Sequence, residues 1–312
     1  MQDHLFGVDV SKDKLDIASL PGQSLRCIGN DAKSIDAWLK TLPPDSHVAM
    51  ESTGRYHQLL ADRAQQARVH VYVLNPKRVL SAARGEGRRS KTDQLDAQVI
   101  VNYLRNHQER LHEWTPGTAV QRQITTLERR RVSLERQLTA LRMTTQDLDG
   151  LDDQVKALLD SAKALRQAID GRIRQLAQSE ESLAQKSRLL EQIPTIGPMS
   201  AISLATLFAR VPFTSSDAVV AFLGLDVRAR DSGMHRGKRH LTKWGPAYLR
   251  KRVWLFGFTA AHTKLFKPRY QQLRARGLSF TAAALILGRR ILRLAWAVWR
   301  TGVAFDAHRL AA

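Results

Sequence analysis

Cysteine and long apolar runs are scarce in this chain of 312 residues, and each scarcity excludes a class of protein. Cys27 is the only cysteine, which excludes a disulfide framework and a cysteine-based zinc site. Long apolar runs are missing, because the nearest approach to a membrane span, Phe280 to Trp299, has three arginines in its middle. Charged residues also interrupt the first twenty positions, which lack a signal-peptide layout. We therefore expect a soluble, cytoplasmic protein with no membrane partner.

Acidic residues are scarce in the last third of the chain. From Arg210 to the end there are 20 Lys and Arg against 4 Asp and no Glu, so +16 of the total net charge of +20 lies there. This segment is also rich in Leu, Ala, Val and Trp, which predicts a folded domain that binds a polyanion such as nucleic acid. A membrane surface is the alternative partner for basic amphipathic segments.

The first 112 residues predict a mixed α/β domain. Three short apolar segments at hairpin spacing are followed by alternating helix and strand, which is the order of a mixed sheet with helices on its faces. The predicted strands are 4–10, 14–20, 23–29, 47–52 and 69–74, and the predicted helices are 31–42, 57–67 and 93–107. The basic, glycine-broken segment 76–90 predicts a mobile loop.

Four carboxylates in this domain fall where metal chemistry would need them. Asp9 and Glu51 end two predicted neighbouring strands, and Asp93 and Asp96 share one face of a helix. Converging acids repel one another unless a cation is bound, and Mg²⁺ prefers such oxygen ligands and could assist a phosphoryl transfer. The alternative is that Asp93 complements the helix dipole and Asp96 is solvated. Other acids of this domain are assigned no role: Asp13, Asp16, Asp36 and Asp62.

Segment 113–190 predicts long amphipathic helices. Apolar residues recur at every seventh position from Leu127 to Leu190, although the complementary seam is only half apolar. This pattern predicts a coiled coil or helical hairpin through which chains oligomerise. The register that runs through Asp149 and Gly150 favours one continuous helix over two arms. Packing within the same chain is the alternative.

Segment 191–312 predicts a basic helical domain. Ile193 to Phe208 contains a Pro-x-Ile-Gly turn between two apolar helices, which looks like a helix-hairpin-helix. The cluster 214–217 is typical of a helix N-terminus, and further helices are expected over 246–261, 265–276 and 280–300. The tryptophans of this domain are assigned to its core: Trp244, Trp254, Trp296 and Trp299.

One stretch of this domain, Arg228 to Gly245, is strongly cationic and contains three glycines. Its Ser232 precedes Gly233, and a hydroxyl among cations is well placed to meet a phosphodiester. The alternative is that Ser232 caps a turn while the cations only hold a nucleic-acid backbone. The candidate nucleic-acid-binding residues are Arg228, Arg230, Arg236, Lys238, Arg239, Lys243 and Arg250.

Several motifs carry a family signature. They are GVDVSKDKLD around Asp9, ESTGRY from Glu51, VLNPKR, KTDQLDA, IPTIGPMSA and FLGLDVRARDSGMHRGKRHLTKWGPAYLRK. In this order, over essentially the whole chain, they resemble the insertion-sequence transposases with a RuvC-like DEDD domain. This is the IS-one-ten type, also called bridge-RNA-guided recombinases, with the Piv invertases as relatives. The chain departs from the expected pattern at Asp226, where we expect an apolar or small residue.

The resemblance implies a fold and a mechanism. It implies that Asp9, Glu51, Asp93 and Asp96 bind Mg²⁺ or Mn²⁺ in an RNase H-like (RuvC-like) domain, 1–112. A helical oligomerisation segment, 113–190, and a C-terminal transposase domain, 191–312, would follow. Ser232 would form a transient phosphoserine link to DNA.

The same resemblance implies partners. These are donor DNA, target DNA, a structured guide RNA that base-pairs with both, and further copies of the chain in a dimer or tetramer with a composite site. From the residues alone, two other functions stay open. One is a RuvC-like, metal-dependent, structure-specific DNA nuclease in which Ser232 is structural. The other is a non-catalytic nucleic-acid-binding protein.

Overall fold

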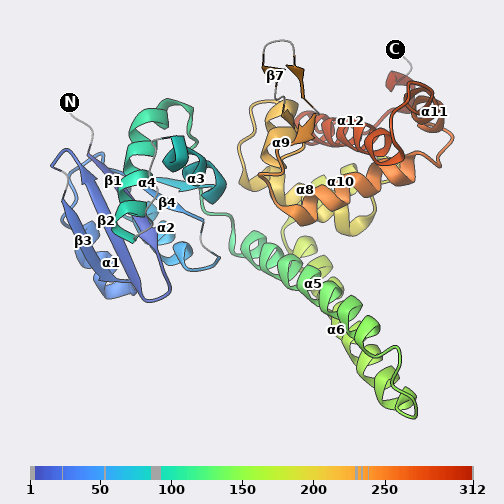
Figure 1. Ribbon diagram of the computed structural model, residues 1–312, viewed down its shortest axis with the longest axis horizontal. Coiled ribbons are helices and arrows are strands. Elements are labelled where there is room, and N and C mark those ends of the chain that lie inside the picture. Colours follow the sequence, from blue (N-terminus) through green and yellow to red (C-terminus); the bar gives the residue numbers. More distant parts are fainter. Residues whose placement is uncertain are drawn as a thin grey trace. The chain divides into compact units, whose positions relative to one another are not determined.

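The computed structural model divides the chain into two compact units, Met1–Pro116 and Gly117–Ala312, each with its own hydrophobic core (Figure 1). The residues that the structure describes are 4–22, 24–52, 54–85, 93–228, 231–232, 235–237 and 239–310. Among these residues, we find no helix with both the length and the apolar character that crossing a membrane requires.

The N-terminal unit is built on a five-stranded mixed sheet, as the sequence predicts. Its strands are β1 (Leu5–Val10), β2 (Lys14–Leu20), β3 (Leu25–Gly29), β4 (His47–Glu51) and β5 (His70–Leu74). Their order in space is β3-β2-β1-β4-β5. The β1–β2 and β2–β3 pairs are antiparallel, whereas β1–β4 and β4–β5 are parallel, so the carboxyl ends of β1, β4 and β5 meet at one edge.

Helices cover both faces of this sheet (Figure 1). The helices are α1 (Ala32–Leu39), α2 (His57–Gln66), α3 (Pro76–Gly85) and α4 (Asp93–His107), followed by the short η1 (Gln108–Arg110). Asp31 caps α1 by accepting a hydrogen bond from the Ser34 amide at 2.9 Å. One core cluster joins Val8 and Met50 to α1 and α2, and another joins Leu5 and Ala49 to α4.

The predicted loop over 76–90 is wrong for its first part. Residues 76–85 form α3, in which Val79 is 3% exposed and packs in the core cluster that includes α4. The apolar residues of α3 are spaced so that they share one face of the helix. The charges and glycines of segment 76–90 made this spacing hard to recognise in the sequence. The rest of the predicted loop, 86–90, lies outside the described residues.

The predicted continuous helix over 113–190 is also wrong. Two helices, α5 (Ala119–Thr144) and α6 (Asp152–Ser179), run side by side in opposite directions (Figure 1). Gly150 adopts a φ of +77° in the turn between them, a conformation that favours glycine. The helical hairpin, one of the two predicted arrangements, is the one that forms. Arg131, one polar position of the second seam, forms an ion pair with Asp170 across this hairpin.

The remaining helices form one basic body with the base of this hairpin. They are α7 (Glu181–Glu191), α8 (Pro198–Arg210), α9 (Ser216–Phe222), α10 (Ala247–Ala260), α11 (Lys267–Ala275), α12 (Phe280–Thr301) and the short η2 (Ala307–Leu310). The central helix is α12, which packs against α7 to α11. Ile124 of α5 and Ile173 of α6 are fully buried in the same core cluster. The predicted helices of this segment are confirmed, and Trp296 lies in the core.

Candidate active site

The first group of candidate residues is organised by the contact between β1 and α4. A Cβ atom on Gly7 would lie 2.3 Å from the Val101 amide nitrogen and 2.5 Å from the Ala97 carbonyl oxygen, so α4 packs directly on the backbone of β1. Successive side chains of a strand alternate between the two faces of a sheet. Asp9, two residues after Gly7, therefore lies on the same face as α4.

Glu51 occupies the corresponding position on the neighbouring strand. In the parallel β1–β4 pair, Gly7 is opposite Ala49, so the register brings Asp9 level with Glu51. Ala49 belongs to the core cluster on the α4 side, which places Glu51 on that face as well. Both carboxylate residues are half-buried. The sheet thus brings together two of the four predicted acids.

The direction of α4 brings its first turn to the same edge. Gln108, directly after α4, has its Nε2 3.3 Å from Nε2 of His47, the first residue of β4. The helix therefore runs from the carboxyl ends of β1 and β4 towards their amino ends. Asp93 begins the helix and Asp96 is half-buried in its first turn, so the backbone gathers the predicted tetrad at one edge of the sheet.

The donor set at this edge fits a divalent cation, because carboxylate oxygens are the ligands that Mg²⁺ and Mn²⁺ accept. The side chain of Asp93 lies outside the described residues. Among the side chains that are described, no three His, Cys, Asp or Glu groups are close enough together to hold a metal ion. The metal role of the tetrad stays a prediction.

A fifth carboxylate, Asp16, flanks this edge and was assigned no role from the sequence. It is opposite Asp9 in the antiparallel β1–β2 register, it is only 5% exposed, and its Oδ2 lies 3.1 Å from Nζ of Lys14. Its placement follows from the hairpin register, because Asp9 and Asp16 are equally far from the intervening turn. By contrast, Asp36 pairs with Arg63 at 2.7 Å far from this edge, as expected of an ordinary acid.

The second candidate, Ser232, lies in a small β-hairpin within the basic body. Strand β6 (Val227–Arg228) pairs with β9 (His240–Leu241), and β7 (Asp231–Ser232) pairs with β8 (His235–Arg236). Figure 1 shows β7 extending away from α9 and α12. Ser232 is opposite His235 and is the last residue of its strand. The side chain of Ser232 lies outside the described residues.

The base of this hairpin is held by close backbone packing. A Cβ atom on Gly245 would lie 2.1 Å from the Phe222 carbonyl oxygen, so only glycine fits there. The Lys243 amide donates to the Gly224 carbonyl oxygen at 3.0 Å, and the Thr242 amide donates to that of Asp226 at 3.1 Å. The unexpected Asp226 has a structural role at this base, because its carboxylate also accepts the hydroxyl hydrogen bond of Thr242.

Arg250 belongs to the same base. Its Nη1 donates to the carbonyl oxygens of Leu223, at 3.3 Å, and of Gly245, and burial lowers its guanidinium pKa. This gives Arg250 a structural task in addition to its predicted contact with nucleic acid. Of the other predicted contact residues, Arg228, Arg239 and Lys243 are exposed. Arg230 and Lys238, as well as the side chain of Arg236, lie outside the described residues.

The C-terminal unit also contains a buried polar cluster that the sequence did not predict. Glu128 of α5 is 2% exposed, accepts a hydrogen bond from the Ser203 hydroxyl, and lies 3.5 Å from Nη2 of Arg252. Burial raises its pKa to about 7, although Arg252, Arg131 and Arg210 act in the opposite direction. No sequence signal distinguishes Glu128 from the exposed polar residues around it, because only tertiary packing encloses it.

Comparison with known proteins identifies relatives along nearly the full chain. The pilin gene-inverting proteins of Moraxella bovis and Moraxella lacunata are each 25% identical over 322 aligned positions, covering 96% of this chain and 97% of the relative. The relatives therefore share both units and not one alone.

Two family models match separate parts of the chain. Residues 6–151 match a model described as "Transposase", of the DEDD type of IS110, and residues 187–271 match "Transposase IS116/IS110/IS902 family". The first match contains the acidic edge of the sheet, and the second contains the Ser232 hairpin. Transposases with such an acidic domain generally use divalent metal ions. The chain therefore belongs to the IS110 (IS-one-ten) family of transposases, enzymes that act on DNA.

Proposed function

We propose that this transposase cuts DNA strands and rejoins them through a transient phosphoserine bond on Ser232, with a divalent ion, Mg²⁺ in the first place, bound by the acidic tetrad. The observation that carries the proposal is the gathering of Asp9, Glu51 and the first turn of α4 at one edge of the sheet. Carboxylate oxygens gathered in this way are the ligands that a divalent ion such as Mg²⁺ prefers. A bound divalent ion would neutralise charge on the scissile phosphate.

The serine step follows from the chemistry of a phosphodiester. The Ser232 oxygen attacks phosphorus, the bond from phosphorus to one sugar oxygen breaks, and that oxygen leaves as a hydroxyl after taking a proton. Attack by a sugar hydroxyl of another strand on the phosphoserine reverses these events and frees Ser232. Because the phosphoserine retains the energy of the phosphodiester bond, no nucleotide cofactor is needed.

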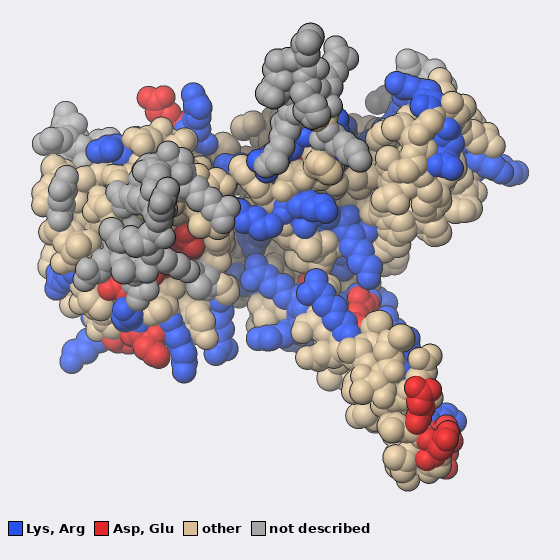
Figure 2. All heavy atoms as spheres, viewed as in Figure 1, with Lys and Arg blue, Asp and Glu red and all other residues tan. Residues whose placement is uncertain are grey.

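Exposed cations around the hairpin support a role in holding DNA. Arg228, Arg239 and Lys243 can bind phosphate oxygens on either side of the strand break. In Figure 2, Lys and Arg cover much of the visible face of the C-terminal unit, while acidic side chains gather at the far end of α5 and α6. A structured guide RNA is the second polyanion that we expect, with base pairing supplying the choice of sequence.

The helical hairpin supports the proposed homo-oligomer. Leu151, Leu158 and Leu165, spaced seven residues apart, are 45%, 49% and 55% exposed. Such a stripe on a helix lies on one face and favours packing against another helix. We propose that a second copy of the chain covers it. A dimer or tetramer formed in this way could combine the tetrad of one chain with Ser232 of another.

The experiment that tests the chemistry is a search for the covalent intermediate. Purified protein is mixed with labelled donor and target DNA, the element-derived RNA and Mg²⁺, and denaturing gels are run before and after protease treatment. We expect a labelled species that protease releases and that a chelator abolishes. Cleaved DNA without such a species would instead support the RuvC-like nuclease. The absence of any cleavage would support a non-catalytic nucleic-acid-binding protein.

The names of the relatives favour recombination over simple cleavage. A protein that inverts a gene must rejoin the strands that it cuts, and two such relatives align with this chain along its length. A nuclease that used water would leave strands unjoined. We therefore expect joined recombinant products in the same reaction, detectable by amplification across the new junction.

A further inference from the structure

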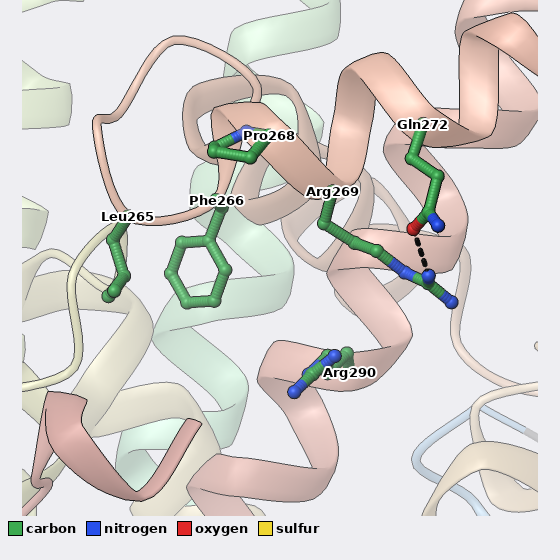
Figure 3. A pocket seen from close by; sticks show the side chains of 6 residues that line it. All are labelled: Leu265, Phe266, Pro268, Arg269, Gln272 and Arg290. Atoms are coloured by element: carbon green, nitrogen blue, oxygen red, sulfur yellow. Dashed lines mark hydrogen bonds between the residues drawn. The ribbon is translucent and has the colours of Figure 1, made fainter. Parts of the chain in front are cut away.

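A pocket in the C-terminal unit is lined by residues that no step above uses. It has a volume of about 500 Å³ and lies where α11 and the loop before it face α12 (Figure 3). Small-molecule sites in proteins span roughly 300 to 1,000 Å³, so the pocket is large enough for one nucleotide. Its lining residues are Leu265, Phe266, Pro268, Arg269, Gln272 and Arg290.

The lining has two chemically different sides. Leu265, Phe266 and Pro268 supply apolar surface, whereas Arg269, Gln272 and Arg290 supply hydrogen-bond donors. Nη1 of Arg269 donates to Oε1 of Gln272, which holds that guanidinium in place at the pocket (Figure 3). A ligand that fits this lining carries negative charge at one end and a flat apolar body at the other.

The charge around the pocket strengthens the requirement for an anion. None of its six lining residues is acidic. From Ser232 to Phe305 the sequence contains sixteen Lys and Arg and not one Asp or Glu, so the segment that carries the pocket is strongly cationic. Guanidinium groups bind phosphate oxygens through paired hydrogen bonds.

We propose that this pocket binds one unpaired nucleotide of a DNA strand, with Arg269 and Arg290 on the phosphate and with the exposed apolar side chains of Leu265 and Pro268 against the base. The enzyme acts on DNA. A base can contact the apolar side of the pocket only after it has left the double helix. Apolar contact with a base reads no hydrogen-bonding pattern and is therefore tolerant of sequence, which suits an enzyme that meets different strands. Gln272 and Arg290 lie outside the segment 187–271 that matches the family model.

The proposal predicts a preference that simple charge attraction would not give. A duplex buries its bases and offers only phosphates, so the apolar side of the pocket stays unused. A single strand can fill both sides. We therefore expect the pocket to contribute to the binding of single-stranded DNA and not to that of duplex DNA of the same sequence.

The test measures fluorescence anisotropy of a labelled single strand and of its duplex with the full-length protein. Arg290→Ala and Leu265→Glu are compared with Lys267→Ala, which removes an exposed cation from α11 outside the pocket lining. We expect either pocket variant to weaken single-strand binding by about fivefold or more and Lys267→Ala by less than about twofold. Leu265 is 38% exposed, so Leu265→Glu should fold normally and close the apolar side.

Competition with deoxyadenosine monophosphate and with inorganic phosphate separates the two sides of the pocket. We expect the mononucleotide to displace the single strand at lower concentration than phosphate does. Equal competition by both, equal losses in Arg290→Ala and Lys267→Ala, no loss in Leu265→Glu, or a larger effect on duplex DNA or on RNA would each overturn the proposal. Ser232→Ala should bind the single strand normally, so failure of the serine chemistry would leave this result unaffected.

Discussion

The two units position their candidate residues in opposite ways. At the acidic edge, Asp9 and Glu51 end strands that are paired within a five-stranded sheet, and α4 presses directly on Gly7. Ser232 ends a strand of two residues whose only described partner strand is β8, equally short. The acids are therefore fixed by long-range packing, while the serine is held mainly through the base of its hairpin. The two candidate sites therefore differ in how much tertiary packing holds their backbone in place.

The largest expected effects come from removing the proposed reactive groups, one in each unit, and comparing strand joining with metal binding. We expect Ser232→Ala and Asp9→Asn each to lower strand joining by about a thousandfold or more, since both act on the reacting phosphate. Only Asp9→Asn should weaken Mn²⁺ binding, measured by calorimetry. Retained joining in Ser232→Ala would contradict the nucleophile, and unchanged Mn²⁺ binding in Asp9→Asn would contradict the metal site.

Substituting Gly7 should show how far the acidic edge depends on packing. The new methyl group of Gly7→Ala would meet backbone atoms of Val101 and Ala97 and displace α4, so the free energy of unfolding should fall by about 3 kcal/mol. Urea unfolding followed by circular dichroism measures the change. Gly171→Ala is the matched control, because its methyl group meets no atom in α6, and it should stabilise the helix by up to about 1 kcal/mol.

The titration of Glu128 should make the free energy of unfolding of the C-terminal unit depend on pH. Burial raises its pKa to about 7 from 4.5, so the folded unit holds a proton that the unfolded chain releases between these values. The stabilisation is complete below pH 4.5 and is lost as the pH rises to about 7, amounting to up to about 3 kcal/mol. Glu128→Gln should flatten the dependence of urea unfolding on pH across this window. A slope equal to that of the unmodified chain would contradict the assignment.

A charge on the exposed stripe of α6 should weaken self-association. Leu158→Asp places a carboxylate where we propose that a second copy packs, and we expect the dissociation constant from sedimentation to rise about tenfold. Folding should persist, because Leu158 is 49% exposed in the single chain. Lys163→Asp, at a polar position of the same helix, serves as the control. Equal association of both variants would exclude this face as the interface.

Local patterns in the sequence predicted most elements correctly. The short apolar segments that form β1 and β2 and the serine-rich start of α9 depend on neighbours within a few residues. The helix α3 was missed because the charges and glycines of segment 76–90 concealed its one apolar face. The break at Gly150 was misjudged because a heptad register alone does not show whether two helical arms continue or fold back.

The sequence by itself predicted the candidate reactive groups of this protein, which are acids that end predicted strands and a serine among cations, and it carries motifs in the order of the IS110 transposases. Only the tertiary structure decided which groups meet. Strand register placed Asp16 opposite Asp9, the direction of α4 brought Asp96 to the same edge, and helix packing enclosed Glu128. These outcomes depend on contacts between residues that are far apart in the chain. Such contacts are set by the packing of whole strands and helices, so local sequence patterns do not predict them.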